Sequence, residues 1–489
     1  MRLEELARKA GLSLAQDAGG AQVTGFAIDH RKVAPGTVFG AFRGARFDGE
    51  DFIDAAVKGG AAAIVARPGA TVEGAVHIAS DEPRRTFAAL AAQYFRPVPG
   101  TIVAVTGTNG KTSTVEMTRQ LWRMAGERAA SIGTLGVTTP DESVSTGLTT
   151  PDIVTFLSNM SGLAREGVTH VAYEASSHGL SQYRNEGLAV AAAAFTNFSR
   201  DHLDYHADME DYFSAKMRLF DEVVTDGAKA VIWTDTDVWS DRAIEHAKAR
   251  GLDVLTVGEK GGTIRLLGRT PTQLGQDLRI AYDGAERTLR LPLIGAYQVA
   301  NALTAAALVI ATGGDAGRTF ENLGRLQPVR GRLERAVIAP VGAPVYIDYA
   351  HTPDALEAAI LALKPHAAGR LITVFGAGGD RDAGKRAPMG EAAARHSDVV
   401  IVTDDNPRGE DAAAIRAEVL RGAPDAREFG GRRDAIAAAI AEARAEDIVL
   451  IAGKGHEQGQ IIGSGENMRV LPFDDVQVAR ECAAAEGAA

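Results

Sequence analysis

One segment constrains the fold of this chain more than any other: residues 101–114, with the sequence Thr-Ile-Val-Ala-Val-Thr-Gly-Thr-Asn-Gly-Lys-Thr-Ser-Thr. An apolar run that enters a glycine turn and then delivers Lys111 and Thr112 predicts a strand, a tight loop and a helix. Backbone N–H groups of the turn and the positive end of the helix dipole favour a bound phosphate. We therefore expect a nucleotide-binding domain of the α/β class.

Two residues of this turn have expected roles. Lys111 would contact the β- and γ-phosphates, and the Thr112 hydroxyl would ligate Mg²⁺. The usual pattern has a further glycine five residues before Gly110, where this chain has Val105, so the match is to a shortened variant. The alternative is a glycine turn with a solvated lysine. The order of strand, loop and helix favours nucleotide binding.

Length and charge limit the classes of protein that fit. The 489 residues suggest about three domains of roughly 150 residues each. The net charge of −11 does not favour nucleic acid or an anionic membrane as a partner. Cys482 is the only cysteine, the opening residues lack an apolar signal core, and the longest apolar stretch, at 299–312, is an expected buried helix. We expect a cytoplasmic monomer with no membrane partner.

Proline and glycine clusters suggest where domains meet. Two prolines and a glycine at 97–100 come directly before the nucleotide strand, and a similar cluster lies at 326–331. The expected domains are therefore 1–97, 98–328 and 329–489.

The third domain has the pattern of a parallel α/β sheet, in which apolar runs alternate with helical patterns. The apolar runs cover 371–375, 398–403 and 447–452, and the helical patterns lie near 385–396, 410–422 and 431–445. Ligands bind such sheets where loops leave the carboxyl ends of strands. Those ends have charged, glycine-rich or polar loops at 376–381, 404–408 and 453–457. One polar loop is ordinary, but three together favour a site.

The middle domain holds further candidates. Glu174 follows an apolar run, so a strand could present its carboxylate to a nucleotide-bound Mg²⁺. His202 and His206 are four residues apart, a spacing that on a helix could suggest zinc, but no third ligand follows in a recognisable spacing. Lys216, taken alone, is expected on a helix surface.

Together these residues resemble the Mur ligase family over essentially the entire chain, and match its branch that adds meso-diaminopimelate to UDP-N-acetylmuramoyl-L-alanyl-D-glutamate in peptidoglycan synthesis. The matching segments are Asp29-His30-Arg31, Pro35-Gly36, Phe39, Gly44, Asp48-Gly49, Phe52-Ile53, the phosphate turn, 149–152, 174–180, 201–206, the Lys216 segment, Asn301, 331–334, 348–354 and the three loops. The family usually has serine where this chain has His30.

The resemblance implies three α/β domains: an N-terminal uridine-binding domain, a central P-loop-type ATP-binding domain and a C-terminal Rossmann-like domain. It also implies an ATP-dependent ligase that forms ADP through an acyl phosphate, with a site that is complete only when the domains close. The implied catalytic residues are Lys111, Glu174, His202 and Lys216. The implied ATP contacts are Gly107, Thr108, Asn109, Gly110, Lys111, Thr112, Ser113, Asn301, Arg332, Asp348 and His351.

Two Mg²⁺ ions are implied, with Thr112, Glu174, His202 and Lys216 as ligands. An ammonium would repel the ion, and in the family this lysine reacts with CO₂ to become a carbamate. The implied contacts of the nucleotide sugar are His30, Thr149, Thr150, Ser176, Gln182 and Arg184. Those of meso-diaminopimelate are Arg386, Asp405, Asn406, Pro407, Arg408, Gly453 and Glu457.

The choice of amino acid rests on Arg408, whose planar fork could bind the distal carboxylate that lysine lacks, while Glu457 would bind the ammonium. The alternative is that Arg408 caps the following helix or pairs with Glu410. Other functions also stay open: a lysine-adding or folylpolyglutamate-type ligase, a P-loop switch or kinase, and a non-catalytic scaffold. A scaffold would lack one of the four catalytic residues, and all four are present.

Overall fold

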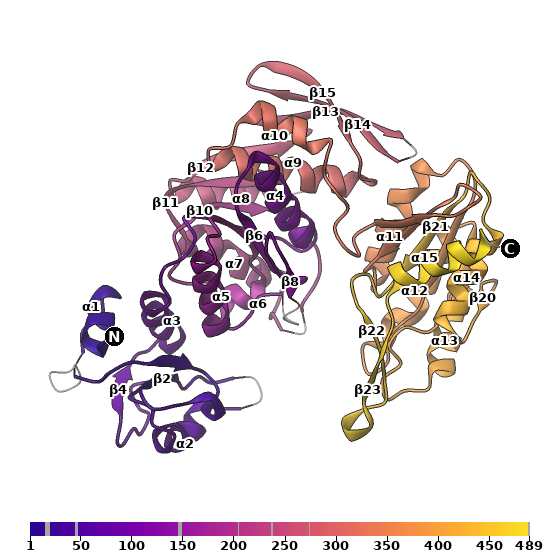
Figure 1. Ribbon diagram of the computed structural model, residues 1–489. Helices are drawn as coiled ribbons and strands as arrows, with labels where there is room; N and C mark the ends of the chain where they lie inside the picture. The colour runs from indigo at the N-terminus through magenta and orange to yellow at the C-terminus, as the bar shows by residue number, and fades with distance from the viewer. Residues whose placement is uncertain are drawn as a thin grey trace. The chain divides into compact units, whose positions relative to one another are not determined.

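The computed structural model describes residues 1–14, 20–44, 47–144, 149–203, 205–235, 238–272 and 274–487 (Figure 1). The chain splits into two compact units, Met1–Arg265 with Asn301–Thr319, and Leu266–Ala300 with Phe320–Ala489. Both contain strands and helices in alternation, which confirms the α/β class expected from the sequence. The domain boundaries near residues 97 and 328 stay a prediction.

The first unit begins with a small parallel sheet. Its strands, in spatial order, are β1 (Gly25–Ala27), β2 (Thr37–Gly40), β3 (Ala63–Ala66) and β4 (Val76–Ala79), and its helices are α1 (Leu3–Lys9), α2 (Ile53–Lys58) and α3 (Pro83–Tyr94). Alternate residues of β3 belong to different cores: Ala63 and Val65 pack with α1 and α3, whereas Ile64 packs with α2. Helices therefore cover both faces of this sheet.

A larger, mostly parallel sheet and its helices form most of the rest of the first unit, which also contains Asn301–Thr319. Its spatial order is β12 (Asp253–Gly258), β11 (Val224–Trp233), β10 (Val190–Phe195), β5 (Thr101–Thr106), β9 (His170–Glu174), β6 (Ala129–Gly133), β7 (Gly136–Thr138) and β8 (Ser143–Val144), and β13 (Ile264–Thr272) pairs with β12. The helices are α4 (Lys111–Ala125), α5 (Ile153–Arg165), α6 (Ser177–Ser181), α7 (Met209–Arg218) and α8 (Val238–Ala249). Because β5 lies between β9 and β10, the loop that follows it has protein on both sides.

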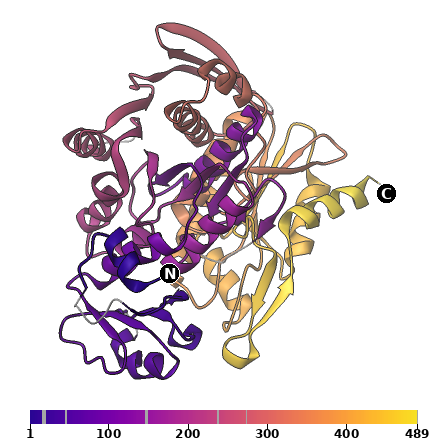
Figure 2. The same cartoon turned by 60° about the vertical axis from the view of Figure 1, so that its left-hand side comes forward.

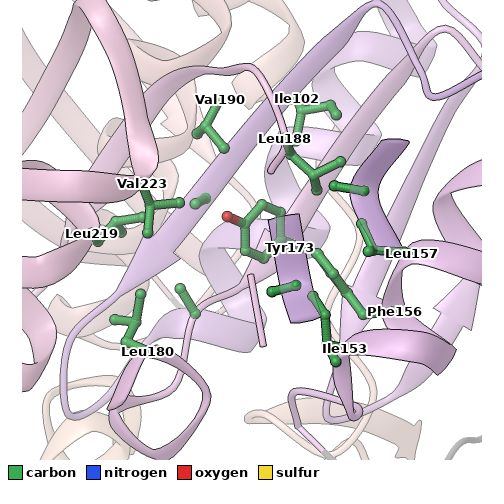
Figure 3. Packing of buried hydrophobic residues seen from close by; sticks show 14 of the residues in the cluster. Ile102, Ile153, Phe156, Leu157, Tyr173, Leu180, Leu188, Val190, Leu219 and Val223 are labelled. Carbon is green, nitrogen blue, oxygen red and sulfur yellow. The ribbon is translucent and has the colours of Figure 1, made fainter. Parts of the chain in front are cut away.

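Strand β9 is anchored by the core around Tyr173. Figure 3 shows the Tyr173 ring among apolar side chains that come from different elements, including Ile102 of β5, Phe156 of α5 and Leu180 of α6. Burial raises the pKa of the Tyr173 hydroxyl. Close packing of this kind leaves little freedom to the strand, so the position of the next residue, Glu174, is fixed by the core.

The second unit contains the parallel α/β sheet that the sequence predicts for the third domain. Its order is β16 (Glu334–Ile338), β17 (Pro344–Asp348), β21 (Ile448–Ala452), β18 (Leu371–Phe375), β19 (Val399–Val402) and β20 (Arg427–Glu428), and β16 alone is antiparallel. The helices are α11 (Pro353–Leu363), α12 (Arg386–His396), α13 (Ala412–Leu420), α14 (Arg432–Glu442) and α15 (Asp475–Glu486). The three apolar runs and three helical patterns predicted for this region are confirmed.

Both faces of this sheet are buried. In β21, Leu450 belongs to the core that contains α11 and α12, whereas Val449 and Ile451 belong to the core that contains α14 and α15. Helix α15, yellow in Figures 1 and 2, packs beside α14. Since both faces are apolar, polar ligand-binding groups are concentrated in the loops at the carboxyl ends of the strands.

The remaining elements include two hairpins and two helices. They are β14 (Gly275–Tyr282) with β15 (Ala285–Leu291), β22 (Gly459–Ile462) with β23 (Arg469–Pro472), α9 (Ala296–Ala311) and α10 (Ala316–Leu323). Helix α9 is the buried helix expected near residues 299–312. Across the described ranges, we find no helix with the length and apolar character that a membrane span requires.

An ion pair buried in the second unit yields a stability prediction. Arg432 at the start of α14 donates to Asp475 at the start of α15 over 2.8 and 2.6 Å, and both side chains are 0% exposed. Asp475→Ala would leave a buried guanidinium without its counter-ion and should cost about 3–5 kcal/mol of folding free energy. Denaturant unfolding of the variant against the parent measures this cost.

Glu481→Ala is the matched control, because Glu481 lies on the same helix and pairs with Arg433 at the surface. It should cost no more than about 1 kcal/mol. Equal costs for the two variants would contradict the assignment of the buried pair as the structural one.

Candidate active site

The turn after β5 requires glycine at two positions. Gly107 has a φ of +139° and Gly110 a φ of +84°, conformations that other residues rarely adopt. A Cβ on Gly107 would lie 2.0 Å from Thr196 Oγ1, and one on Gly110 would lie 2.3 Å from Asn301 Oδ1. Helix α4 begins at the next residue, Lys111, so the predicted strand, loop and helix are all present.

Two lysines converge on one carbonyl of this loop. Lys111 Nζ donates to Gly107 O at 2.9 Å and to Thr108 O at 2.7 Å, and Lys216 Nζ donates to Gly107 O at 2.8 Å. Burial, followed by the charge of Lys111, lowers the pKa of Lys216 well below its usual value. The environment therefore favours an uncharged amine at Lys216.

The surface position expected for Lys216 from its residue pattern alone is wrong. The side chain is 1% exposed and its Nζ lies 4.3 Å from the centre of the Tyr212 ring. Tyr212 in turn shares a hydrogen bond with Thr108 Oγ1 and lies beside the His202 ring. The face of α7 that contains Lys216 is thus covered by the phosphate loop, a contact between distant segments that helical periodicity does not reveal.

Glu174 ends strand β9 beside the same loop. It pairs with Val105 of β5 in the sheet register, and its side chain is 2% exposed. The carboxylate accepts hydrogen bonds from Thr134 N at 2.7 Å and from Thr134 Oγ1 at 3.2 Å. The structure thereby brings Glu174, Lys111 and Lys216 around the end of β5.

Thr112 and Glu174 offer the oxygen atoms that Mg²⁺ prefers as ligands. Within the described ranges, no three His, Cys, Asp or Glu side chains cluster to hold a metal by themselves, and Asp204 of the predicted motif lies outside those ranges. Mg²⁺ prefers oxygen ligands, keeps several waters and shares phosphate oxygens with its nucleotide. The Thr112 hydroxyl and the Glu174 carboxylate are oxygen donors of this kind, and their role as ligands stays a prediction.

A hydrogen-bonded network joins five residues that the resemblance assigned to the nucleotide sugar. Thr150 Oγ1 lies 2.9 Å from Ser176 Oγ, and Arg184 donates to Thr150 O at 2.8 Å and to Gln182 Oε1 at 2.7 Å. Thr149 reaches the same region through a 3.1 Å contact with Thr134, the residue that holds Glu174. The sixth residue, His30, lies in the N-terminal sheet region, where its ring stacks on Phe52 at 4.5 Å.

In the second unit, three predicted ATP residues lie near the start of β16 and the end of β17: Arg332 precedes β16, Asp348 ends β17 and His351 follows it. Asp348 accepts hydrogen bonds from Leu333 N at 2.7 Å and Ala350 N at 2.9 Å, and the Arg332 guanidinium lies over the Tyr349 ring. His351 Nδ1 lies 2.9 Å from Tyr349 O. Burial raises the pKa of Asp348 to about 6, although Arg332 and the two N–H groups oppose this shift.

The loops after β19 and β21 are joined by side-chain hydrogen bonds. Asn406 donates to Glu457 Oε2 at 2.9 Å. A Cβ on Gly453 would lie 2.5 Å from Asp405 Oδ2, so glycine permits the loops to meet. Buried Asp405, Asn406 and Pro407 and half-buried Glu457 therefore form one continuous region.

Arg408 has neither of the two alternative roles considered from the sequence, which were to cap the following helix or to pair with Glu410. Asp411 caps helix α13, and Glu410 pairs with Arg386, so Arg408 neither caps the helix nor pairs with Glu410. Its backbone has a φ of +52° and is held by Ile461 O and Gly463 N, while its side chain donates to Gly379 O at 2.8 Å. Arg386 is 2% exposed and is bound to both Glu410 and Glu418, so its contact with a ligand stays a prediction.

Backbone conformations that are rare for residues other than glycine concentrate at these sites. In the described part of the chain, six such residues have positive φ: Tyr183, His202, Asp283, Leu333, Asp380 and Arg408. Asp283 lies in a hairpin turn, whereas the other five belong to or adjoin the segments predicted to bind ligands. Strained conformations are retained where the surrounding structure holds them, and they cluster at functional sites.

Comparison with known proteins agrees with this arrangement. Three family models match: "Mur ligase family, catalytic domain" at residues 22–96, "Mur ligase middle domain" at 105–309 and "Mur ligase, glutamate ligase domain" at 331–455. A protein of Zymomonas mobilis is 60% identical over 459 residues, which cover 94% of each chain. The chain belongs to the Mur ligase family. As a Mur ligase it is an ATP-dependent enzyme that forms ADP and an amide bond, and its three-domain α/β fold is confirmed.

Two further relatives extend this finding. A protein of Bradyrhizobium diazoefficiens is 52% identical over 461 residues, covering 93% of each chain. It has the same name as the Zymomonas relative, UDP-N-acetylmuramoyl-L-alanyl-D-glutamate--2,6-diaminopimelate ligase. A solved structure of a ligase with that name aligns with a TM-score of 0.72 and 33% identity, and the match covers 95% of each chain.

Three side chains that support the sites of this Mur ligase are not among the predicted site residues. Thr134 binds Glu174, Tyr212 lies under Lys216, and Lys454 is fully buried between Asn406 and Glu457. Of the three, only Lys454 has a signal in the sequence, because it lies between two glycines in the loop at 453–457. Thr134 and Tyr212 become meaningful only through contacts with segments far away in the chain.

The buried carboxyl of Asp348 yields a pH prediction. Its pKa of about 6 in the folded protein lies above the ordinary 3.8, so its stabilising contribution is complete below about pH 3.8 and is lost as the pH rises through 6. Asp348→Asn removes this titration. Relative to the variant, the parent should therefore lose up to about 3 kcal/mol of stability between pH 4 and pH 7.5.

Thermal unfolding of both proteins across this pH range measures the relative change. Asp277→Asn, at an exposed position of the same unit, is the control and should show no such trend. A difference between Asp348→Asn and the parent that stays constant with pH would contradict the shifted titration.

Proposed function

We propose that this Mur ligase joins meso-diaminopimelate to the D-glutamate γ-carboxylate of UDP-N-acetylmuramoyl-L-alanyl-D-glutamate, with conversion of ATP to ADP and phosphate. The names of the relatives at 60% and 52% identity support this substrate pair. The product would be a precursor of peptidoglycan. The use of ATP agrees with a cytoplasmic location, which, like the monomeric state, stays a prediction.

One observation supports the amino-acid substrate most strongly: the loop after β19, which contains Arg408, is joined to the loop after β21, which contains Glu457, by the hydrogen bond from Asn406 to Glu457. An amino-acid end group contains one ammonium and one carboxylate. The Glu457 carboxylate could bind the ammonium, and the planar guanidinium of Arg408 could bind the carboxylate through two parallel hydrogen bonds. Asn406, bonded to Glu457, adds a polar group that is already oriented. Lysine lacks the second carboxylate and would leave the Arg408 guanidinium, which donates to Gly379 O, without a carboxylate partner.

The first chemical step activates a poor acyl donor. An oxygen of the glutamate carboxylate attacks the γ-phosphorus of ATP, the bond from that phosphorus to the ADP oxygen breaks, and an acyl phosphate forms. Anions approach each other in this step, so positive charge must offset their repulsion. Lys111 would contact the phosphates together with N–H groups of the loop at 107–113, and Asn301, Arg332, Asp348 and His351 would bind the rest of the nucleotide.

The second step forms the amide. The uncharged amine of diaminopimelate attacks the acyl carbon, a tetrahedral intermediate forms, and the bond to phosphate breaks as the amine loses a proton. The network of Thr149, Thr150, Ser176, Gln182 and Arg184, with His30, would hold the nucleotide sugar so that its carboxylate stays in place.

Thr112, Glu174, His202 and a modified Lys216 would hold two Mg²⁺ ions. These ions would supply charge stabilisation to the transferred phosphoryl group. The pKa of Lys216 is lowered by burial and by Lys111, which favours the uncharged amine that reacts with CO₂. In that reaction the amine nitrogen forms a bond to carbon and releases a proton, so a potential cation becomes a carbamate anion.

ADP release provides the test of this function. It should require both the nucleotide sugar and the amino acid, and in a competition between meso-diaminopimelate and L-lysine the former should be incorporated. Incorporation of lysine would identify the lysine-adding alternative. ADP release at the same rate without either substrate would instead indicate an NTPase, and absence of ATP turnover would indicate a scaffold.

Arg408 yields a prediction about specificity. Arg408→Ala removes the partner of the distal carboxylate and should reduce kcat/KM for meso-diaminopimelate by about 10²- to 10⁴-fold, because the site loses a charged contact that lysine never makes. The preference over L-lysine should fall by a similar factor. Steady-state kinetics with each amino acid measure both changes.

Arg395→Ala is the control for this substitution. Arg395 is an exposed arginine of the same unit and lies 3.6 Å from Glu357. Its removal should leave both amino-acid parameters unchanged. Unchanged kinetics in Arg408→Ala would remove Arg408 from the proposed binding site.

Lys216 yields a prediction about modification. The intact protein, measured under native conditions with bicarbonate, should be heavier by one CO₂, and the added mass should map to Lys216. Activity should fall when CO₂ is removed and should return with bicarbonate. Lys364→Arg, at an exposed lysine, should keep both properties. A fully active enzyme with an unmodified Lys216 would refute the modification.

A further inference from the structure

A fully buried lysine lies in the amino-acid region but has no role in the proposed reaction. Lys454 is 0% exposed, and its Nζ donates to Asn406 Oδ1 at 2.9 Å and to Glu457 Oε2 at 3.2 Å. A buried ammonium is costly unless it is paired and hydrogen-bonded. Both partners of Lys454 are residues proposed to bind the substrate.

The backbone on both sides of Lys454 is fixed by close packing. Gly453 has a φ of +117°, and a Cβ there would lie 2.5 Å from Asp405 Oδ2. Gly455 has a φ of +53°, and a Cβ there would lie 2.6 Å from Tyr349 Cβ. Neither position accepts a side chain without movement of its neighbours, so the loop holds Lys454 in its buried position.

Lys454, Asn406 and Glu457 form a closed triangle of hydrogen bonds. Asn406 Nδ2 donates to Glu457 Oε2, and Asn406 Oδ1 accepts from both Lys454 and Ile461 N. These donors determine which way the amide of Asn406 is turned, because its oxygen must face two N–H groups. Among the described residues, the hydrogen bonds from Asn406 and Lys454 to the Glu457 carboxylate both end on Oε2, and Oε1 would receive a ligand ammonium.

We propose that Lys454 is a positioning residue that sets the specificity of the amino-acid site. It does not touch the substrate. Its ammonium fixes the amide of Asn406 and the carboxylate of Glu457 in the orientation that receives the ammonium-bearing end of diaminopimelate. This inference rests on the proposed function of the same site. It adds that the buried Lys454 determines the orientation of Asn406 and Glu457.

Lys454→Met tests the proposal, since methionine is similar in length but has neither charge nor donor. The KM for meso-diaminopimelate should rise about 10- to 100-fold, because a misplaced binding group of this kind has effects of that order. The KM values for ATP and for the nucleotide sugar should change less than about threefold, since those substrates do not contact the triangle. A purely structural lysine would lower stability without this selective effect.

A double-mutant cycle shows whether Lys454 acts through Glu457. In a Glu457→Gln background, Lys454→Met should add little to the KM for meso-diaminopimelate, because the group that it positions has already changed. If the rise in KM of the double variant equals the product of the rises in the two single variants, Lys454 and Glu457 act independently, and the proposal is overturned. So would an unchanged KM in the folded Lys454→Met enzyme.

Arg370→Met is the matched control. Arg370 pairs with Asp447 at 2.7 Å, at the amino ends of the β18 and β21 strands, whereas Lys454 follows the carboxyl end of β21. This variant should lower the unfolding temperature without a change in the KM for meso-diaminopimelate. If Lys454→Met fails to fold, Lys454→Gln takes its place, since its shorter side chain cannot bridge both partners and should give the same selective rise.

The wild-type enzyme separates this inference from the proposed function. If wild-type ADP release does not depend on meso-diaminopimelate, the proposed function fails. If it does depend on it, and the folded Lys454 variants keep a wild-type KM, only the positioning role fails.

Discussion

The carbonyl oxygen of Gly107 accepts hydrogen bonds from two lysines. The roles proposed for these lysines in phosphate binding and metal binding depend on this close approach. Lys111 belongs to the helix that follows the loop, and Lys216 comes from a helix more than a hundred residues later. Both ammonium groups cannot keep their charge easily at one buried carbonyl. Burial, followed by the charge of Lys111, lowers the pKa of Lys216, the more deeply buried lysine.

Buried cationic side chains also occur in the second unit, but there they are paired with carboxylates. Lys454 and Arg432 are also fully buried cations, but each has a carboxylate within hydrogen-bonding distance. Arg432 additionally donates to Ala452 O and Asp404 O, at the carboxyl ends of β21 and β19. Buried charge in this unit therefore holds loops in place, whereas burial and the charge of Lys111 lower the pKa of Lys216.

Much of the fold could be predicted because it depends on local pattern. The strands β18, β19 and β21 are apolar runs in the sequence, and α12, α13 and α14 follow the helical spacing. The glycines of the phosphate loop also give a strong signal, because only glycine adopts the required φ beside Thr196 and Asn301. In contrast, the burial of Lys216 could not be predicted from its helix, whose polar pattern is equally typical of a surface.

The sequence by itself determined the α/β class, the phosphate loop and the residue types of the site, because these depend on neighbours in the chain. The tertiary structure alone decided which of these residues meet. It placed Tyr212 between Lys216, Thr108 and His202, it paired Glu410 with Arg386 rather than Arg408, and it closed the triangle of Lys454, Asn406 and Glu457. Burial and electrostatic coupling depend on distances through space, and no local pattern contains them.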